Sequence, residues 1–126
     1  MTLFEECKEA LSADFSVVDG QALKDAMDIL SKYPFSKGGI VWSEIKSSDY
    51  ENIDDLLIKN PMKTDDVFVF ADDASIPVFK TKLKLIAENI YDVTALSPKL
   101  FIFNDEIILQ PLFPTEMIRL GVKTKL

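Results

Sequence analysis

Histidine is absent from the 126 residues of this sequence. Its absence excludes Ser-His-Asp and Cys-His nucleophilic catalysis and every metal site that uses imidazole ligands. Cysteine occurs once, as Cys7, so no disulfide can form within the chain, and a reducing, cytoplasmic setting is the simplest expectation. Only four glycines are present, and the sequence contains neither a GxGxxG motif nor a P-loop. Most common catalytic constellations are therefore missing, and we expect neither an enzyme nor a resident cofactor or metal.

Long apolar runs are also missing. No stretch approaches the roughly 20 residues that a membrane-spanning helix needs. The first ten residues are acidic and amphipathic, unlike the basic and then apolar start of a signal peptide. With 48% hydrophobic and 28% charged residues, the composition is typical of one globular domain over residues 1–126. We expect a single cytoplasmic domain that does not bind membranes.

Acidic residues are in excess and are unevenly placed. The formal net charge is −7, and residues 47–76 carry eight acids against two lysines, which is −6. A surface of this charge repels nucleic acid and steers a basic partner towards it. The alternative is that these acidic loops only keep the protein soluble.

Two helices are predicted near the N-terminus. Thr2 and Glu5 match a capping box, and apolar residues recur at helical spacing over residues 3–12, which places Cys7 on the buried face. A second helix begins at Asp19-Gly20 and ends before Pro34. Because the linker between them is short, we expect the two helices to pack against each other as a hairpin.

The rest of the chain predicts a mixed pattern. Strands are expected over residues 40–45, 67–70, 92–96, 99–103, 106–110 and 117–122, a polar turn over 47–49, and helices over 53–59 and 77–90. Residues 67–70, VFVF, lack polar alternation, so this strand should be buried on both faces near the sheet centre. Residues 77–90 fit strand and helix patterns, and the longer helical match favours a helix. The fold class is α+β, with N-terminal helices on a mostly antiparallel sheet of about five to six strands.

Four aspartates flank the VFVF strand, as the pairs Asp65-Asp66 and Asp72-Asp73. Asp66 and Asp72 lie roughly 20 Å apart at about 3.3 Å per strand residue. A metal ion needs oxygen ligands within ~2.1–2.6 Å, so the two pairs cannot share one ion. The Asp72-Asp73 pair alone could cap the next element, contact a partner, or support carboxylate chemistry.

A family resemblance points in the same direction. The segment VFVFADDASIPVFKTKLKLIAENIYDVTALSPKLFIFND, followed by MIRLGV, spans residues 67–122 and resembles bacterial immunity proteins of contact-dependent growth inhibition systems. The resemblance implies a small cytoplasmic protein that binds and blocks the toxin domain of its own system, commonly a nuclease. It transfers no catalytic residue, because such proteins act by occlusion.

The leading hypothesis is an immunity protein, monomeric or in a heterodimer with its toxin, that covers the active or substrate-binding site of a basic toxin. Its expected contacts are two aromatic anchors and eight acids: Trp42, Tyr50, Asp49, Glu51, Asp54, Asp55, Asp65, Asp66, Asp72 and Asp73. The alternatives are a small carboxylate- or metal-dependent enzyme built on Asp72 and Asp73, and a non-enzymatic adaptor for another protein.

Overall fold

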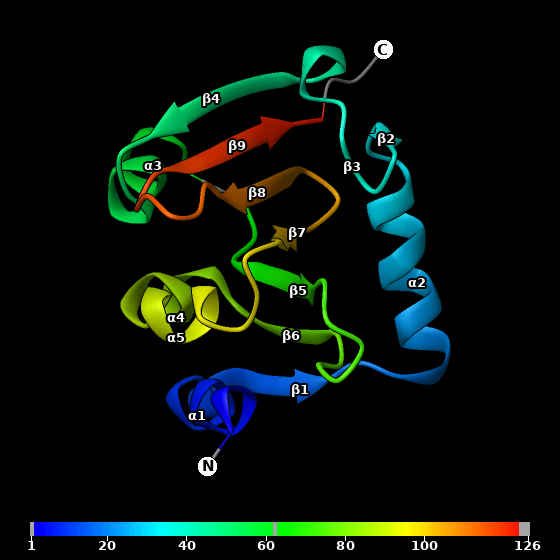
Figure 1. Cartoon of the computed structure of the whole chain (residues 1–126), viewed down its shortest axis with the longest axis vertical. Coiled ribbons are helices and arrows are strands. Elements are labelled where there is room, and N and C mark those ends of the chain that lie inside the picture. The colour runs from blue at the N-terminus through cyan, green and yellow to red at the C-terminus, as the bar shows by residue number, and fades with distance from the viewer. Residues whose placement is uncertain (1, 62, 124–126) are drawn as a thin grey trace.

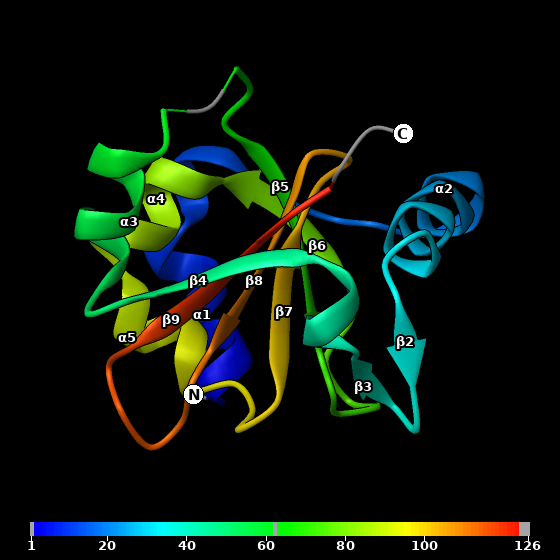
Figure 2. The ribbon, with the colours of Figure 1, turned by 90° about the horizontal axis from the view of Figure 1, so that it is seen from above.

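One antiparallel sheet forms the centre of the molecule, with helices on both of its faces (Figures 1 and 2). The computed structural model describes residues 2–61 and 63–123, so the ends of the predicted domain and Met62 lie outside the described residues. The seven strands are, in spatial order, β1 (Phe15–Val17), β6 (Phe79–Lys82), β5 (Asp66–Ala71), β7 (Leu100–Phe103), β8 (Ile107–Pro111), β9 (Ile118–Val122) and β4 (Lys46–Tyr50). The α+β prediction is confirmed, with a slightly larger sheet than expected.

The helices divide unequally between the two faces. Four helices cover one face: α1 (Leu3–Ala10), α3 (Ile53–Lys59), α4 (Leu83–Glu88) and α5 (Ile90–Thr94). The other face carries α2 (Gly20–Ser31), followed by the small hairpin of β2 (Phe35–Ser36) and β3 (Gly39–Ile40). No helix in the described part of the chain is long and apolar enough to cross a membrane.

The VFVF strand contributes side chains to two apolar cores, one on each face of the sheet. In β5 the side chains alternate, so Val67 and Val69 are fully buried under the four helices, whereas Phe68 and Phe70 face α2. β5 lies between β6 and β7, which confirms the predicted place near the sheet centre. Phe68 and Phe70 are only half-buried, so the expectation that this strand is buried on both faces is wrong for their side. The single helix α2 covers less of the sheet than the four helices on the other face do.

Several predictions of local structure are confirmed. The Thr2 hydroxyl accepts a hydrogen bond from the Glu5 backbone, and the Glu5 carboxylate accepts one from the Thr2 backbone, which completes the capping box of α1. α3 forms where a helix was predicted, with Asn52 as its N-cap. The predicted hairpin before and after Asn104-Asp105 and the final strand are also present, as β7, β8 and β9.

The predicted helical hairpin is wrong. The described chain forms β1 between α1 and α2, and β1 pairs with β6 at one edge of the sheet. The two helices therefore begin on opposite sides of the sheet, and their apolar stripes enter different cores.

The predicted helix over residues 77–90 is wrong in its first part. Phe79–Lys82 forms the strand β6, which pairs with β1 on one side and β5 on the other, and the helix begins only at Leu83. The Thr81 side chain is fully buried and its hydroxyl donates to the Asp14 carbonyl at 2.6 Å. This segment is a strand because β1 and β5 lie on either side of it and satisfy its backbone groups.

Three other predicted strands and turns are corrected. Residues 92–96, predicted as a strand, begin within α5, where Val93 and Leu96 are buried three residues apart at helical spacing. The predicted strand over 40–45 is only β3 and then a 3-10 helix at Trp42–Glu44. The predicted turn over 47–49 lies inside β4, because β9 pairs with it along five residues.

Cys7 should not react while the protein is folded. It is fully buried in the larger core, and burial, followed by the nearby Asp92 carboxylate, raises the pKa of its thiol to about 12. Because the thiolate is the reactive form, we expect no labelling by an alkylating reagent at pH 8 without denaturant and one equivalent of labelling in denaturant. Mass spectrometry over time checks this, and rapid labelling of the native protein would contradict the burial of Cys7.

Candidate protein-binding surface

A surface hollow of about 750 Å³ opens between three segments that are distant in sequence. Its walls are the start of α3, the α4–α5 pair and the loop from β8 to β9. Four carboxylates line it, those of Asp54, Glu88, Asp92 and Glu116, and none of its lining residues is a lysine or an arginine. We call it the acidic hollow. Its field favours a cationic guest.

Large apolar side chains are exposed at the same place. Tyr91 on α5 and Phe113 on the β8–β9 loop are each 69% exposed, and Met117 beside them is also exposed. Ile58, 80% exposed, follows Asp54 by four residues and therefore lies on the same face of α3. Soluble domains rarely group exposed apolar side chains around one hollow without an interaction at that place.

Hydrogen bonds fix the loop that carries Phe113. The Thr115 hydroxyl donates to the Leu112 carbonyl at 2.7 Å and accepts from the Met117 backbone at 3.2 Å. The Leu112 backbone N–H donates to the Met117 carbonyl at 2.9 Å, which closes the loop at its base. The Tyr91 hydroxyl donates to Glu116, a hydrogen bond that raises the pKa of Tyr91 and ties α5 to the loop. The loop backbone and the Tyr91 side chain are thus held in place before any partner arrives.

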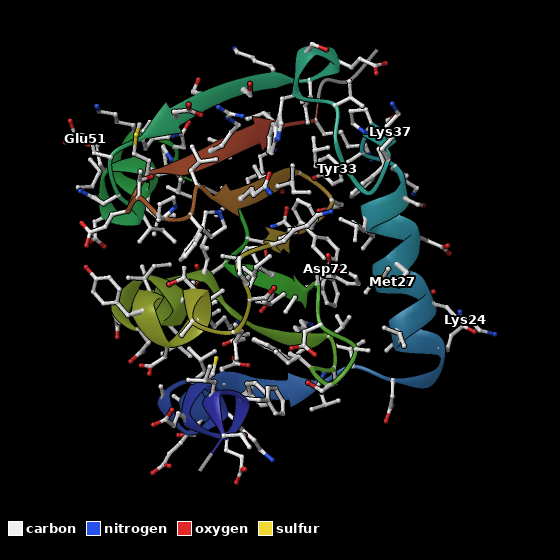
Figure 3. The ribbon with its side chains drawn as sticks, viewed as in Figure 1. Lys24, Met27, Tyr33, Lys37, Glu51 and Asp72 are labelled. Atoms are coloured by element: carbon white, nitrogen blue, oxygen red, sulfur yellow. The ribbon has the colours of Figure 1, made fainter. Side chains whose placement is uncertain are left out.

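The predicted contact residues divide among separate parts of the surface. Asp54 lines the acidic hollow, and Glu51 lies beside α3, directly before the lining residue Asn52 (Figure 3). Asp55, on the same helix, forms an exposed ion pair with Lys59 at 3.3 Å. Tyr50, predicted to be exposed, is half-buried against the larger core, and its hydroxyl accepts from the Asn60 side chain at 2.9 Å.

Asp49 and Trp42 lie on the α2 face of the sheet. The Arg119 guanidinium donates two hydrogen bonds to the Asp49 carboxylate, at 2.7 and 3.0 Å, and lies 5.5 Å from the centre of the Trp42 ring. These hydrogen bonds hold the pKa of Asp49 below its ordinary value. The three side chains form one stack within the protein, with Trp42 half-buried against the smaller core.

Asp65 and Asp66 stabilise the start of α4 and the β5–β6 pair. Asp66 and Lys82, which face each other across the two strands, form an ion pair at 2.5 Å that lowers the pKa of Asp66. The Asp65 carboxylate accepts from the Lys84 backbone at 3.1 Å and so caps α4, whose own N-cap residue provides no side-chain bond. Both carboxylates have local structural roles.

Asp72 and Asp73 follow β5 and separate from each other. Asp72 lines a second hollow of about 500 Å³ beside α2, together with Met27, and lies far from Glu51 (Figure 3). The Asp73 carboxylate instead accepts from the Ser75 backbone at 2.9 Å and from the Ser75 hydroxyl at 2.6 Å, hydrogen bonds that lower its pKa. Nowhere in residues 2–61 and 63–123 do three Cys, Asp or Glu side chains gather as a metal site would require.

Most residues that line the acidic hollow were not predicted from the sequence. Its missed members are Glu88, Tyr91, Asp92, Phe113, Glu116 and Met117. One signal was available, since Phe113 stands in a proline-bounded loop after a strand, where an aromatic side chain has no strand pattern to join. Tyr91 stands between the predicted helix over 77–90 and the predicted strand over 92–96, and Asp92 begins that strand, whereas both residues lie in the helix α5.

An α+β domain with an acidic hollow and exposed aromatic side chains beside it has the surface that is typical of a protein-binding module. Residues 1–121 match the family model described as CdiI immunity protein, EcoliA0-like, and the chain belongs to this family. No curated protein matches the sequence. The match includes α1 and α2, which the resemblance over residues 67–122 did not cover. The protein is thus an immunity protein of contact-dependent growth inhibition, and its family implies a cognate toxin as the partner.

Proposed function

We propose that this protein neutralises its cognate toxin by covering the active or substrate-binding site of a basic nuclease domain. The observation that carries the proposal is the acidic hollow, a preformed site with four carboxylates and exposed aromatic side chains. A nuclease needs a basic cleft, because its contacts with phosphate dominate nucleic-acid affinity. An acidic surface complements such a cleft in charge.

Electrostatic complementarity would also make capture fast. Complementary charge raises association rates well above the values of neutral pairs at low salt. Rapid capture suits a cytoplasmic monomer that must form a heterodimer with the toxin before the toxin reaches its substrate. Glu51 and Asp54 are exposed, Asp54 lines the hollow, and we expect these two acids to contribute most to this steering.

Charge reversal beside the hollow tests the proposal. The unchanged protein should bind the toxin domain encoded beside it and block its activity. The double variant Glu51→Lys, Asp54→Lys should lower the association rate about tenfold at low ionic strength, and less at high salt, because surface charges are screened. Stopped-flow or surface-plasmon measurements give these rates.

The matched control is Asp25→Lys, Asp28→Lys, which changes the net charge equally but on α2, across the sheet. This control should change the rate less than threefold. Equal effects of the two double variants would show that only the total charge matters. Failure of the unchanged protein to bind the toxin domain would overturn the proposed function itself.

A further inference from the structure

We propose that the acidic hollow receives an arginine side chain of the toxin, held between the Tyr91 and Phe113 rings and the surrounding carboxylates. This inference rests on the proposed function and specifies its interface. It makes Phe113, Tyr91, Asp92 and Glu116 the residues that anchor the toxin, whereas Glu51 and Asp54 mainly steer it.

The charge of the hollow is uncompensated within the described chain. The ion pairs among described residues involve Asp14, Asp49, Asp55 and Asp66, and none of the four carboxylates that line the hollow takes part in them. A guanidinium that enters the hollow would bring a positive charge to a site lined by four carboxylates and no cation. Arginine can also pair with a carboxylate through two parallel hydrogen bonds.

The exposed rings favour arginine over lysine. A guanidinium stacks on an aromatic face and loses its hydration more readily than an ammonium group does. Tyr and Phe side chains that are exposed in the free protein gain most when a partner covers them. The hydrogen-bonded loop and the Tyr91–Glu116 contact already fix the site, so little conformational entropy is lost on binding.

The same chain already holds an arginine in this way. Arg119 lies over the Trp42 ring and donates two hydrogen bonds to Asp49. One aromatic face and one carboxylate are sufficient to hold the Arg119 guanidinium. The acidic hollow offers two exposed rings and four carboxylates and contains no arginine of its own. Its size, about 750 Å³, leaves room for the side chain and the backbone that carries it.

Three variants test the inference with the toxin domain encoded beside this protein. Phe113→Ala, Asp92→Asn and Glu116→Gln should each weaken the equilibrium affinity about tenfold, mainly through faster dissociation. Their controls are Phe35→Ala, an exposed phenylalanine on the opposite face, and Asp25→Asn, which should each stay within twofold. Thermal melting should show that each variant is folded, which is expected because the substituted side chains are exposed.

An arginine-to-alanine scan of the toxin then identifies the guest. One toxin variant should bind the unchanged immunity protein more weakly than the unchanged toxin does. The same toxin change should weaken binding to Phe113→Ala much less, since the two changes remove the same contact. If the hollow variants bind like the unchanged protein while Glu51→Lys, Asp54→Lys slows association, the inference is overturned and the proposed function stands. If no toxin arginine couples to Phe113, the arginine assignment is overturned. If the unchanged protein does not bind the toxin domain, both proposals fail.

Discussion

Replacing Phe79 by alanine is expected to lower the free energy of unfolding by about 3–5 kcal/mol. Phe79 is fully buried in β6, where it pairs with Val17 of β1 and Val69 of β5. Its ring centre lies 4.9 Å from that of Phe15 and 6.1 Å from that of Phe4. Truncation would therefore leave a cavity where α1, β1 and the sheet meet, and these rings cannot all move to fill it.

Urea unfolding followed by circular dichroism measures this loss. The control Phe35→Ala removes a partly exposed ring whose aromatic partner is Phe101, and it should cost about 1 kcal/mol or less. A small domain has only about 5–15 kcal/mol of stability in total, so Phe79→Ala should also lose protection against the toxin at elevated temperature. A loss below about 1 kcal/mol for Phe79→Ala would contradict the described packing of β6.

The second large effect is expected at Gly121, where Gly121→Ala should cost about 1–3 kcal/mol. A Cβ atom at this position would lie 2.9 Å from Trp42 Cζ3 and 3.0 Å from both Ile108 Cγ2 and Ile45 Cδ1. The indole ring is rigid and sits over β9, so it cannot yield without moving the Arg119 side chain and its bonds to Asp49. Glycine is needed here for the close approach of Trp42 and not for a special backbone angle.

Fluorescence of the single tryptophan gives a direct measure, because Trp42 is the side chain that must move. Gly121→Ala should change the native emission spectrum as well as the urea midpoint. Gly39→Ala is the matched control, since a Cβ there would meet no atom within 4 Å, and it should leave both almost unchanged. Equal stability of the two variants would show that Trp42 does not pack on Gly121 as described.

Local signals predicted a large part of the fold. The capping box at Thr2 and Glu5, the N-capped helix α3 and the hairpin through Asn104-Asp105 depend on neighbouring residues, so a short stretch of sequence determines them. The VFVF segment was correctly predicted as a strand near the sheet centre, though not as buried on both faces, because a four-residue run of β-formers needs no particular partner to be recognised.

The wrong predictions of secondary structure lie in segments whose conformation depends on pairing with distant parts of the chain. Phe79–Lys82 becomes a strand because β1 and β5 stand on either side of it, and nothing within residues 77–90 reveals those neighbours. Lys46–Tyr50 carries no apolar alternation, since most of its side chains are exposed at a sheet edge, and it is a strand because β9 pairs with it. In both segments a long-range backbone ladder overrides the local preference.

The candidate site shows the same division. The sequence indicated an acidic partner-binding surface, but it treated eight acids as equivalent. The structure assigns Asp65 to capping α4 and pairs Asp49 and Asp66 with cations. It also places Asp72 on the α2 face, in another hollow. What distinguishes one carboxylate from the next is the side chain it faces, and that depends on sheet register and on which face each helix covers.

Composition and local periodicity were sufficient to predict the α+β class, the burial of Cys7 and the acidity of residues 47–76, and the segment over residues 67–122 carried the resemblance to immunity proteins. Asp54, Tyr91, Phe113 and Glu116 share one hollow, and this arrangement depends on contacts between distant parts of the chain. These residues come from three segments up to 62 positions apart, and the antiparallel pairing of β8, β9 and β4 with the docking of α5 brings them together. Such a site has no sequence motif, because its spacing exists only in the folded chain.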